Sequence, residues 1–142
     1  MPNMVQVGDG GIDGVGRLLT KPANVDSDLA IAQVKGGMWK AGDFRDFTGR
    51  IPILPAATGT YITLHPVTSR AAHAEAARLG VLRMDGAAQT YPRAQLWSIV
   101  DCFENRPPRL PPLANPYTGQ AMQQELLQLF QAHTGGEVVA WV

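Results

Sequence analysis

A short apolar segment, DLAIAQVK at residues 28–35, restricts the possible folds of this chain more than any other part of the sequence. In an extended strand, alternate side chains share a face. One face of this strand then carries Leu29, Ile31, Gln33 and Lys35. Both faces are apolar until Gln33 and Lys35 appear, and that pattern is typical of a central strand covered on both sides. The segment therefore predicts a central sheet strand with a polar end.

The rest of the chain alternates between strand and helix patterns. Further strands are expected at 4–7 and 12–19, joined by the turn-forming GDGG, and at 58–64 and 94–99. The expected helices are 41–49, an alanine-rich helix that starts at Thr68 or Ser69 and ends at Gly80, and a short one through Phe103. This alternation predicts an α/β sandwich with a central mixed β-sheet flanked by helices.

The chain divides into three parts. Residues 1–105 hold the α/β core, and residues 106–119 contain five prolines, so an extended strap without regular structure is expected there. Residues 120–142 are expected to form a helix, at about 120–133, and a terminal strand, at 137–142, that pack on the core or on a partner chain. The helix has a wide apolar stripe made of Leu126, Leu127, Leu129 and Phe130. Because closed twofold dimers are the commonest assembly, this stripe favours a homodimer.

Composition limits the function only weakly. The chain has 142 residues, the size of one domain, and its 12 basic and 12 acidic side chains cancel. Any DNA contact must therefore come from a local basic cluster. The single cysteine, Cys102, cannot form an internal disulfide and is expected to pack in a short helix. No signal peptide and no run of about 18 apolar residues is evident, which predicts a cytoplasmic protein without membrane contact.

Three polar side chains could together make a reaction centre. Asp13 follows a glycine-rich turn, and Gln33 and Lys35 share the face at the end of the central strand. A carboxylate and an amide oxygen are ligands that Mg²⁺ accepts, and the backbone carbonyl of Val34 is a candidate third ligand. The Lys35 ammonium is suited to orient water or to stabilise charge on a phosphate. The alternative is a polar strand end that simply emerges into solvent.

The motifs GDGGIDGVG (8–16) and IAQVKGG (31–37) resemble the Mrr-like branch of the PD-(D/E)xK nuclease superfamily, where glutamine commonly replaces the second acid. The similarity continues in order through KAGDFRDFTG, GTYITLHPVT, EAARLG, YPRAQLWSI and LPPLANPYTGQAM. The whole resembles the restriction-endonuclease-like domain attached to some bacterial DNA methyltransferases. It implies a restriction-endonuclease-like sandwich and a magnesium- or manganese-dependent endonuclease of a restriction-modification or defence type. It also implies double-stranded DNA as partner and, in a longer parent protein, a methyltransferase or other domain.

The resemblance also implies roles for the three candidate residues. Asp13 is expected to bind the metal, Gln33 to bind it or orient its ligand, and Lys35 to be the catalytic lysine. Their functional atoms should then lie within roughly 8 Å of one another. The zero net charge and the expected lack of the acid-bearing helix that normally precedes the first strand oppose an active enzyme, and neutral Gln33 should hold metal weakly. The alternative is a nuclease-like module that binds DNA or a protein partner without cleaving.

Charged residues in and beside the helix expected at 41–49 flank this centre. Lys40, Arg45 and Arg50 are candidates for contacts with DNA phosphates, although solvated helix charges explain them about as well. Asp43 and Asp46, three residues apart, could mimic paired catalytic acids. The better explanation for both is that acids are favourable near the start of a helix.

Two further features receive structural interpretations. Asp9 stands before a glycine in a turn, where aspartate usually serves the backbone geometry and only sometimes a metal. Trp39, Trp97 and Trp141 are too scattered to form a base-stacking platform, so core or interface packing is expected.

Overall fold

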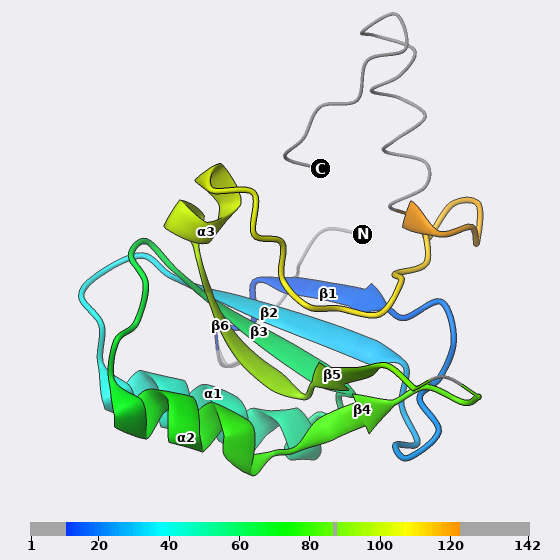
Figure 1. Ribbon diagram of the computed structural model, residues 1–142, viewed down its shortest axis with the longest axis horizontal. Coiled ribbons are helices and arrows are strands. Elements are labelled where there is room, and N and C mark those ends of the chain that lie inside the picture. Colours follow the sequence, from blue (N-terminus) through cyan, green and yellow to red (C-terminus); the bar gives the residue numbers. More distant parts are fainter. Residues whose placement is uncertain (1–10, 87, 123–142) are drawn as a thin grey trace, which may run out of the picture.

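The computed structural model of the protein describes residues 11–86 and 88–122. These residues form a mixed α/β fold around a four-stranded sheet (Figure 1). In spatial order its strands are β1 (Gly14–Arg17), β2 (Leu29–Lys35), β3 (Thr58–Thr63) and β6 (Ala94–Ser98). β1 runs antiparallel to β2, whereas β2, β3 and β6 are parallel. The predicted α/β class with a central mixed sheet is therefore confirmed.

Two helices, α1 (Ala41–Ile53) and α2 (Arg70–Arg78), cover one face of the sheet (Figure 1). α1 packs on β3, and α2 packs on β6 and on α1. α2 begins after Ser69, whose hydroxyl accepts a hydrogen bond of 3.2 Å from the Ala72 backbone N–H. Of the two caps that the sequence offered, Ser69 is the one used.

α1 is longer than the helix predicted at 41–49. Phe44, Phe47 and Ile51 recur at helical spacing, and all three are buried in the core. Pro52 lies inside the last turn, where a proline normally favours a helix end. The burial of Ile51 stabilises this turn, so the helix continues to Ile53.

Gly59 in β3 allows α1 to approach the sheet closely. A Cβ atom added there would lie 2.7 Å from Ile51 Cδ1 and 2.9 Å from Phe47 Cζ, closer than real Cβ atoms come to other atoms. On the same face of β3, the Tyr61 ring contacts Phe44 and Phe47, with ring centroids 5.2 and 5.3 Å apart. The absence of a side chain at Gly59 thus fixes the distance between helix and sheet.

The opposite face of the sheet carries the proline-rich segment that follows α3 (Ile99–Phe103) (Figure 1). Residues 106–112 form neither helix nor strand. Gln95 of β6 donates a hydrogen bond of 3.1 Å to the Arg109 carbonyl and accepts one of 3.0 Å from its backbone N–H. Trp97 Nε1 donates to the Arg106 carbonyl at 2.7 Å. Side chains of β6 therefore form hydrogen bonds with backbone groups of the strap.

Two predictions of strands need correction. The strand expected at 12–19 is shorter, because β1 contains only Gly14–Arg17, and Asp13 precedes it. An antiparallel pair, β4 (Val81–Arg83) with β5 (Thr90–Pro92), was not predicted. Strands of three residues are too short to show an alternating pattern, so sequence reasoning had no signal for them.

None of the helices in the described part of the chain is long and apolar enough to span a membrane. Several expectations fall outside the described residues: the strands at 4–7 and 137–142, nearly all of the helix at 120–133, Asp9 and Trp141.

Candidate functional site

The candidate site lies where β2 ends, in the middle of the sheet. Gln33 and Lys35 are on the face of β2 that α1 covers, since they lie two and four residues after Ile31, which is buried in the core with Phe44 of α1. In the register with β3, Gln33 lies beside Tyr61, and Lys35 lies beside Thr63. The predicted sharing of one face by Gln33 and Lys35 is therefore present in the fold.

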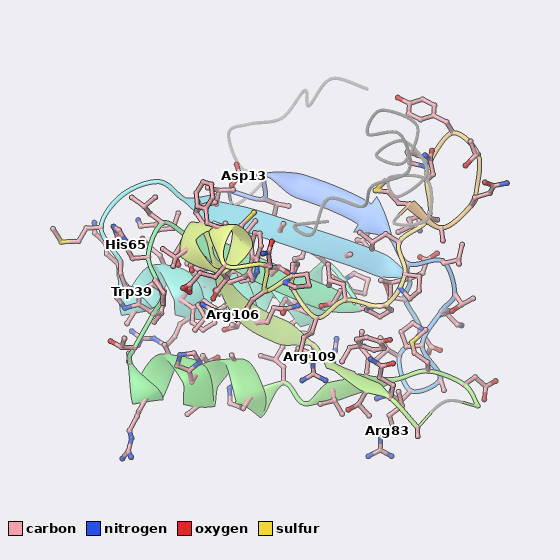
Figure 2. The ribbon with its side chains drawn as sticks, turned by 45° about the horizontal axis from the view of Figure 1, so that its top comes forward. Asp13, Trp39, His65, Arg83, Arg106 and Arg109 are labelled. Carbon is pink, nitrogen blue, oxygen red and sulfur yellow. The ribbon has the colours of Figure 1, made fainter. Side chains whose placement is uncertain are left out.

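Asp13 reaches the same end of β2 from the start of β1 (Figure 2). Its backbone N–H donates to the Ala32 carbonyl at 2.9 Å, and its Oδ2 accepts a hydrogen bond of 2.7 Å from the Val34 N–H. The carboxylate thus contacts the backbone of β2 between Gln33 and Lys35. Whether all three functional atoms fall within the expected 8 Å stays a prediction, as does the role of the Val34 carbonyl.

The turn before Asp13 also contacts Gln33. Gly11 has φ +80°, which favours glycine, and a Cβ atom there would lie 3.1 Å from Gln33 Nε2. The Gln33 Oε1 atom is buried and has no hydrogen-bond partner among the described residues. A buried amide oxygen without a partner is costly, by about 1–3 kcal/mol. An oxygen of this kind, beside one carboxylate, fits the ligand preference of a hard divalent cation.

The Lys35 ammonium is held by an acid that sequence reasoning had not placed in the site. Lys35 Nζ lies 2.6 Å from Asp43 Oδ2, in the first turn of α1, and only 20% of the Lys35 side chain is exposed. The hydrogen bond from Lys35 lowers the pKa of Asp43; partial burial opposes this, and the positive charges of Lys35 and Lys40 add to it. Burial, and then the charge of Asp43, raises the pKa of Tyr61. Asp43 is therefore an ionised neighbour of the site.

The strand–turn–helix order of the sequence contained a signal for this ion pair. Lys35 is the last residue of β2 and Asp43 the third of α1, and the connection between these elements is only five residues long. A connection this short brings the first turn of the helix back to the strand end. The expectation that Asp43 serves only the helix start is thus incomplete, because its carboxylate also binds Lys35.

A hollow of about 530 Å³ opens beside Gln33 and α1. Its charged lining residues are Asp43, Arg45, Asp46 and Arg50. Of the three basic residues predicted to meet DNA, the hollow brings together Arg45 and Arg50, whereas Lys40 does not line it. Lys40 precedes α1 in an extended conformation, whereas Arg45 and Arg50 lie within the helix. Within the described residues, no group of three His, Cys, Asp or Glu side chains could hold a metal ion.

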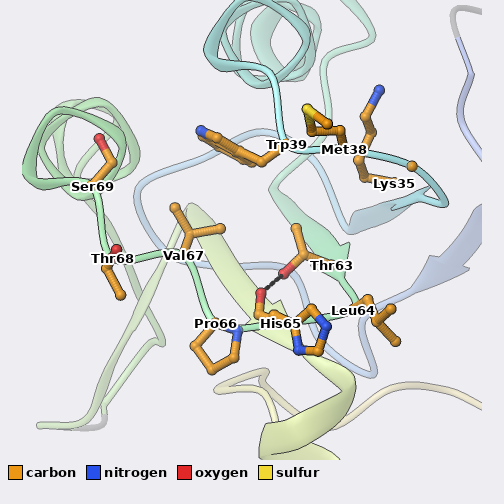
Figure 3. A pocket seen from close by; sticks show the side chains of 11 residues that line it. Lys35, Met38, Trp39, Thr63, Leu64, His65, Pro66, Val67, Thr68 and Ser69 are labelled. Carbon is orange, nitrogen blue, oxygen red and sulfur yellow. Dashed lines mark hydrogen bonds between the residues drawn. The ribbon is translucent and has the colours of Figure 1, made fainter.

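A second hollow, of about 390 Å³, is lined by Lys35 (Figure 3). It is bounded by the segments that follow β2 and β3, from Gly37 to Trp39 and from Thr63 to Ser69. The Thr63 hydroxyl donates to the His65 carbonyl at 2.7 Å, which fixes the start of the second segment. The Lys35–Asp43 pair therefore lies between two hollows, since Lys35 lines one and Asp43 the other.

The two tryptophans of the described region lie in different environments. Trp97 lies on the strap face of the sheet, where it lines an apolar hollow of about 310 Å³. Trp39 packs on the other side against Phe44 and Tyr61, with ring centroids 5.6 and 6.0 Å apart. The two rings thus form no common platform. Cys102 is a free, half-buried thiol in α3.

No protein-family model, curated protein or solved structure matches this chain.

The Lys35–Asp43 pair should give the protein an acid-sensitive contribution to stability. Because the folded-state pKa of Asp43 is lowered, this contribution is complete above the ordinary aspartate pKa of about 4 and is lost as pH falls through the lowered value. Asp43→Asn should therefore reduce the melting temperature at neutral pH and show a shallower decline in acid. The control is Asp26→Asn, which removes the exposed ion pair of Asp26 Oδ1 with Lys21 Nζ, 3.8 Å apart. If the melting temperatures of the wild type and Asp43→Asn declined in parallel as the pH falls, the Lys35–Asp43 pair would not be the source of the acid sensitivity.

Proposed function

We propose that this chain is a metal-dependent DNA endonuclease module of the restriction-endonuclease-like type, with Asp13, Gln33 and Lys35 at its reaction centre. The observation that carries the proposal is the contact of the Asp13 carboxylate with Val34 N–H, between Gln33 and Lys35. One acid, one amide oxygen and one lysine are thereby gathered at a single strand end. The family resemblance of the sequence supplies the reaction class.

The residues divide the work of phosphodiester hydrolysis as follows. Asp13 and the Gln33 amide oxygen would hold Mg²⁺ or Mn²⁺, with the Val34 carbonyl as a further ligand. The cation, when bound, would stabilise negative charge on the phosphate and offer coordination positions for water. Lys35 orients the attacking water or stabilises negative charge that develops on the phosphate. Water bonds to phosphorus, the bond to the leaving sugar oxygen breaks, and a proton ends on that oxygen.

Asp43 and the arginines of α1 would assist the same reaction. Asp43 is a positioning residue, because it holds the Lys35 ammonium in one place at the strand end. Arg45 and Arg50 line the hollow beside Gln33, and neither forms an ion pair within the described residues. Their charges are available to phosphates of double-stranded DNA. Because cutting both strands takes two centres, the proposal includes a homodimer.

One set of contacts favours a second candidate, a nuclease-like module that binds DNA or a protein without cleaving. The Lys35 ammonium is already paired with Asp43, and one oxygen of Asp13 is bonded to the backbone of Val34. A reacting phosphate would have to compete with the first contact, and a metal with the second. In the second candidate these contacts are permanent parts of the fold.

Nicking of supercoiled plasmid DNA separates the two candidates. The active enzyme should convert supercoiled into open-circular or linear DNA with Mg²⁺ or Mn²⁺ and leave it intact with EDTA. Protein that binds the plasmid in a gel-shift assay but never cuts it, with either metal, would favour the binding module.

Gln33→Glu should preserve or tighten binding of Mn²⁺. The carboxylate has almost the length of the amide but offers a harder and more negative oxygen. Gln33→Ala should weaken both binding and cleavage, because it removes the oxygen altogether. Calorimetric titration with Mn²⁺ measures the affinities, which should decrease from Glu through Gln to Ala at position 33. The matched control is Gln95→Ala, a glutamine on the strap face of the sheet. An Ala variant that binds Mn²⁺ as tightly as wild type would exclude Gln33 as a ligand.

A further inference from the structure

We propose that the hollow of about 390 Å³ beside Lys35 is a nucleobase-binding site, in which one unstacked base of the DNA substrate stacks on Trp39. The inference rests on the proposed function, since it names the part of the DNA that the same site would recognise. It assigns to Trp39 a role beyond core packing. No second aromatic platform is required, because only one base is held.

The position of the hollow is the first argument. It lies beyond the carboxyl ends of β2 and β3, two parallel neighbouring strands, and between the segments that leave them. In α/β sheets, ligands bind in crevices outside the carboxyl ends of strands. A volume of about 390 Å³ falls in the range of small-ligand pockets, roughly 300–1,000 Å³, and has room for one base with part of its sugar.

The orientation of Trp39 is the second argument. Its indole is anchored by core rings, with Phe44 tilted at 43° and Tyr61 edge-on at 81°. Figure 3 shows the indole edge-on, with one face turned toward the segment that contains Thr63 and Val67. Trp39 is half-buried, as expected for a ring with one covered and one open face. A fixed aromatic face of this kind stacks bases of any identity.

The chemistry of the walls is the third argument. Met38 and Leu64 border the hollow and are 84% and 60% exposed, so apolar surface faces solvent at its edge. Pro66 and Val67 extend this apolar wall. Large exposed apolar side chains that gather around one concave site are typical of a binding surface. A flat, weakly hydrated base fits such walls better than a sugar or a peptide backbone does.

Lys35 connects the hollow to the proposed reaction centre. Its ammonium is positively charged, and none of the described residues that line the hollow is an aspartate or a glutamate. A nucleotide whose base stacks on Trp39 would carry its phosphate to this end, where the phosphate could replace Asp43 as the partner of Lys35. Base binding and the release of Lys35 from Asp43 would then be coupled.

Photocrosslinking tests the site without requiring cleavage. Oligonucleotides containing one 5-iododeoxyuridine are mixed with the full chain in EDTA, irradiated, and the crosslinked peptide is identified by mass spectrometry. Three probes are compared: a single strand, a perfect duplex and a duplex with the iodinated base unpaired. Crosslinks should map to Trp39 or its neighbours in the hollow and be strong for the single strand and the unpaired base. Weak crosslinking of the perfect duplex would show that the base must first leave the stack.

Variants of the two tryptophans provide the matched control. Trp39→Ala should weaken binding of the single strand roughly tenfold, the loss typical of one stacking residue, whereas Trp39→Phe should retain most of the affinity. Trp97→Ala, on the opposite face of the sheet, should leave affinity unchanged. Melting temperatures show which variants are folded. If Trp39→Ala does not fold, the crosslinks of the wild type still test the site.

The outcomes separate this inference from the proposed function. DNA that is bound and cut, with crosslinks mapping away from the hollow, would overturn the base site and leave the nuclease intact. Crosslinks to Trp39 without cleavage in Mg²⁺ or Mn²⁺ would support the base site and exclude the nuclease. No crosslink with any probe and no cleavage would exclude both.

Discussion

Replacing Lys35 with alanine should abolish plasmid cleavage while Mn²⁺ binding survives or tightens. The ammonium is not a metal ligand, and its loss removes a positive charge from the neighbourhood of the cation. It also removes the group that stabilises charge on the phosphate, so the chemical step should slow by at least roughly 10²–10³-fold. Single-turnover cleavage and calorimetric titration with Mn²⁺ measure the two effects separately.

Asp13→Ala should behave differently and lose both metal binding and cleavage, because it removes the carboxylate assigned to the metal. The control for charge alone is Lys21→Ala, an exposed lysine whose Nζ lies 3.8 Å from Asp26. This control should cut DNA as the wild type does. If Lys35→Ala lost metal binding while Asp13→Ala retained it, the assigned roles would be wrong, and the binding module would become the better account.

The largest expected effect on stability comes from Gly59→Ala. The added methyl group would lie 2.7–2.9 Å from atoms of Ile51 and Phe47, both fully buried in the core. α1 would have to move away from the sheet, and overpacking of this kind typically costs about 1–3 kcal/mol. The melting temperature should fall on the order of 5–10 °C.

The matched control is Gly16→Ala in β1. This glycine is also in a strand of the same sheet, but a Cβ atom there meets nothing within 4 Å. Alanine should be neutral or stabilise slightly, because glycine in a strand interior costs conformational entropy. Equal melting temperatures for the two variants would show that α1 can yield at Gly59 without loss, contrary to the packing described above.

The sequence predicted the elements whose patterns are long enough to be read. The apolar DLAIAQVK segment contains β2, and its polar end marks the candidate site. The alanine-rich helix starts after Ser69, one of the two predicted caps. These predictions succeeded because strand alternation and capping depend on residues that are close in sequence. The class of the fold followed from their order.

What sequence reasoning missed depends on contacts between segments. The hydrogen bond from the Val34 N–H to Asp13 depends on the pairing of β1 with β2. The ion pair of Lys35 with Asp43 depends on the position of α1. The close approach at Gly59 depends on Ile51 and Phe47 from another element. Local patterns carry no information about the approach at Gly59 or the bond to Asp13, whereas the short connection between β2 and α1 does indicate that Asp43 lies near Lys35.

The bond between Asp13 and Val34 makes one backbone amide a natural reporter of the candidate site. While Asp13 Oδ2 accepts this hydrogen bond, the Val34 N–H is protected from exchange with solvent deuterium. A cation that draws the carboxylate toward itself would lengthen the bond and speed the exchange of that amide. In an amide NMR spectrum, the Val34 signal should therefore respond to Mg²⁺ at concentrations that leave the amides of β3 unchanged. Occupancy of the site could then be followed without DNA, cleavage or a label.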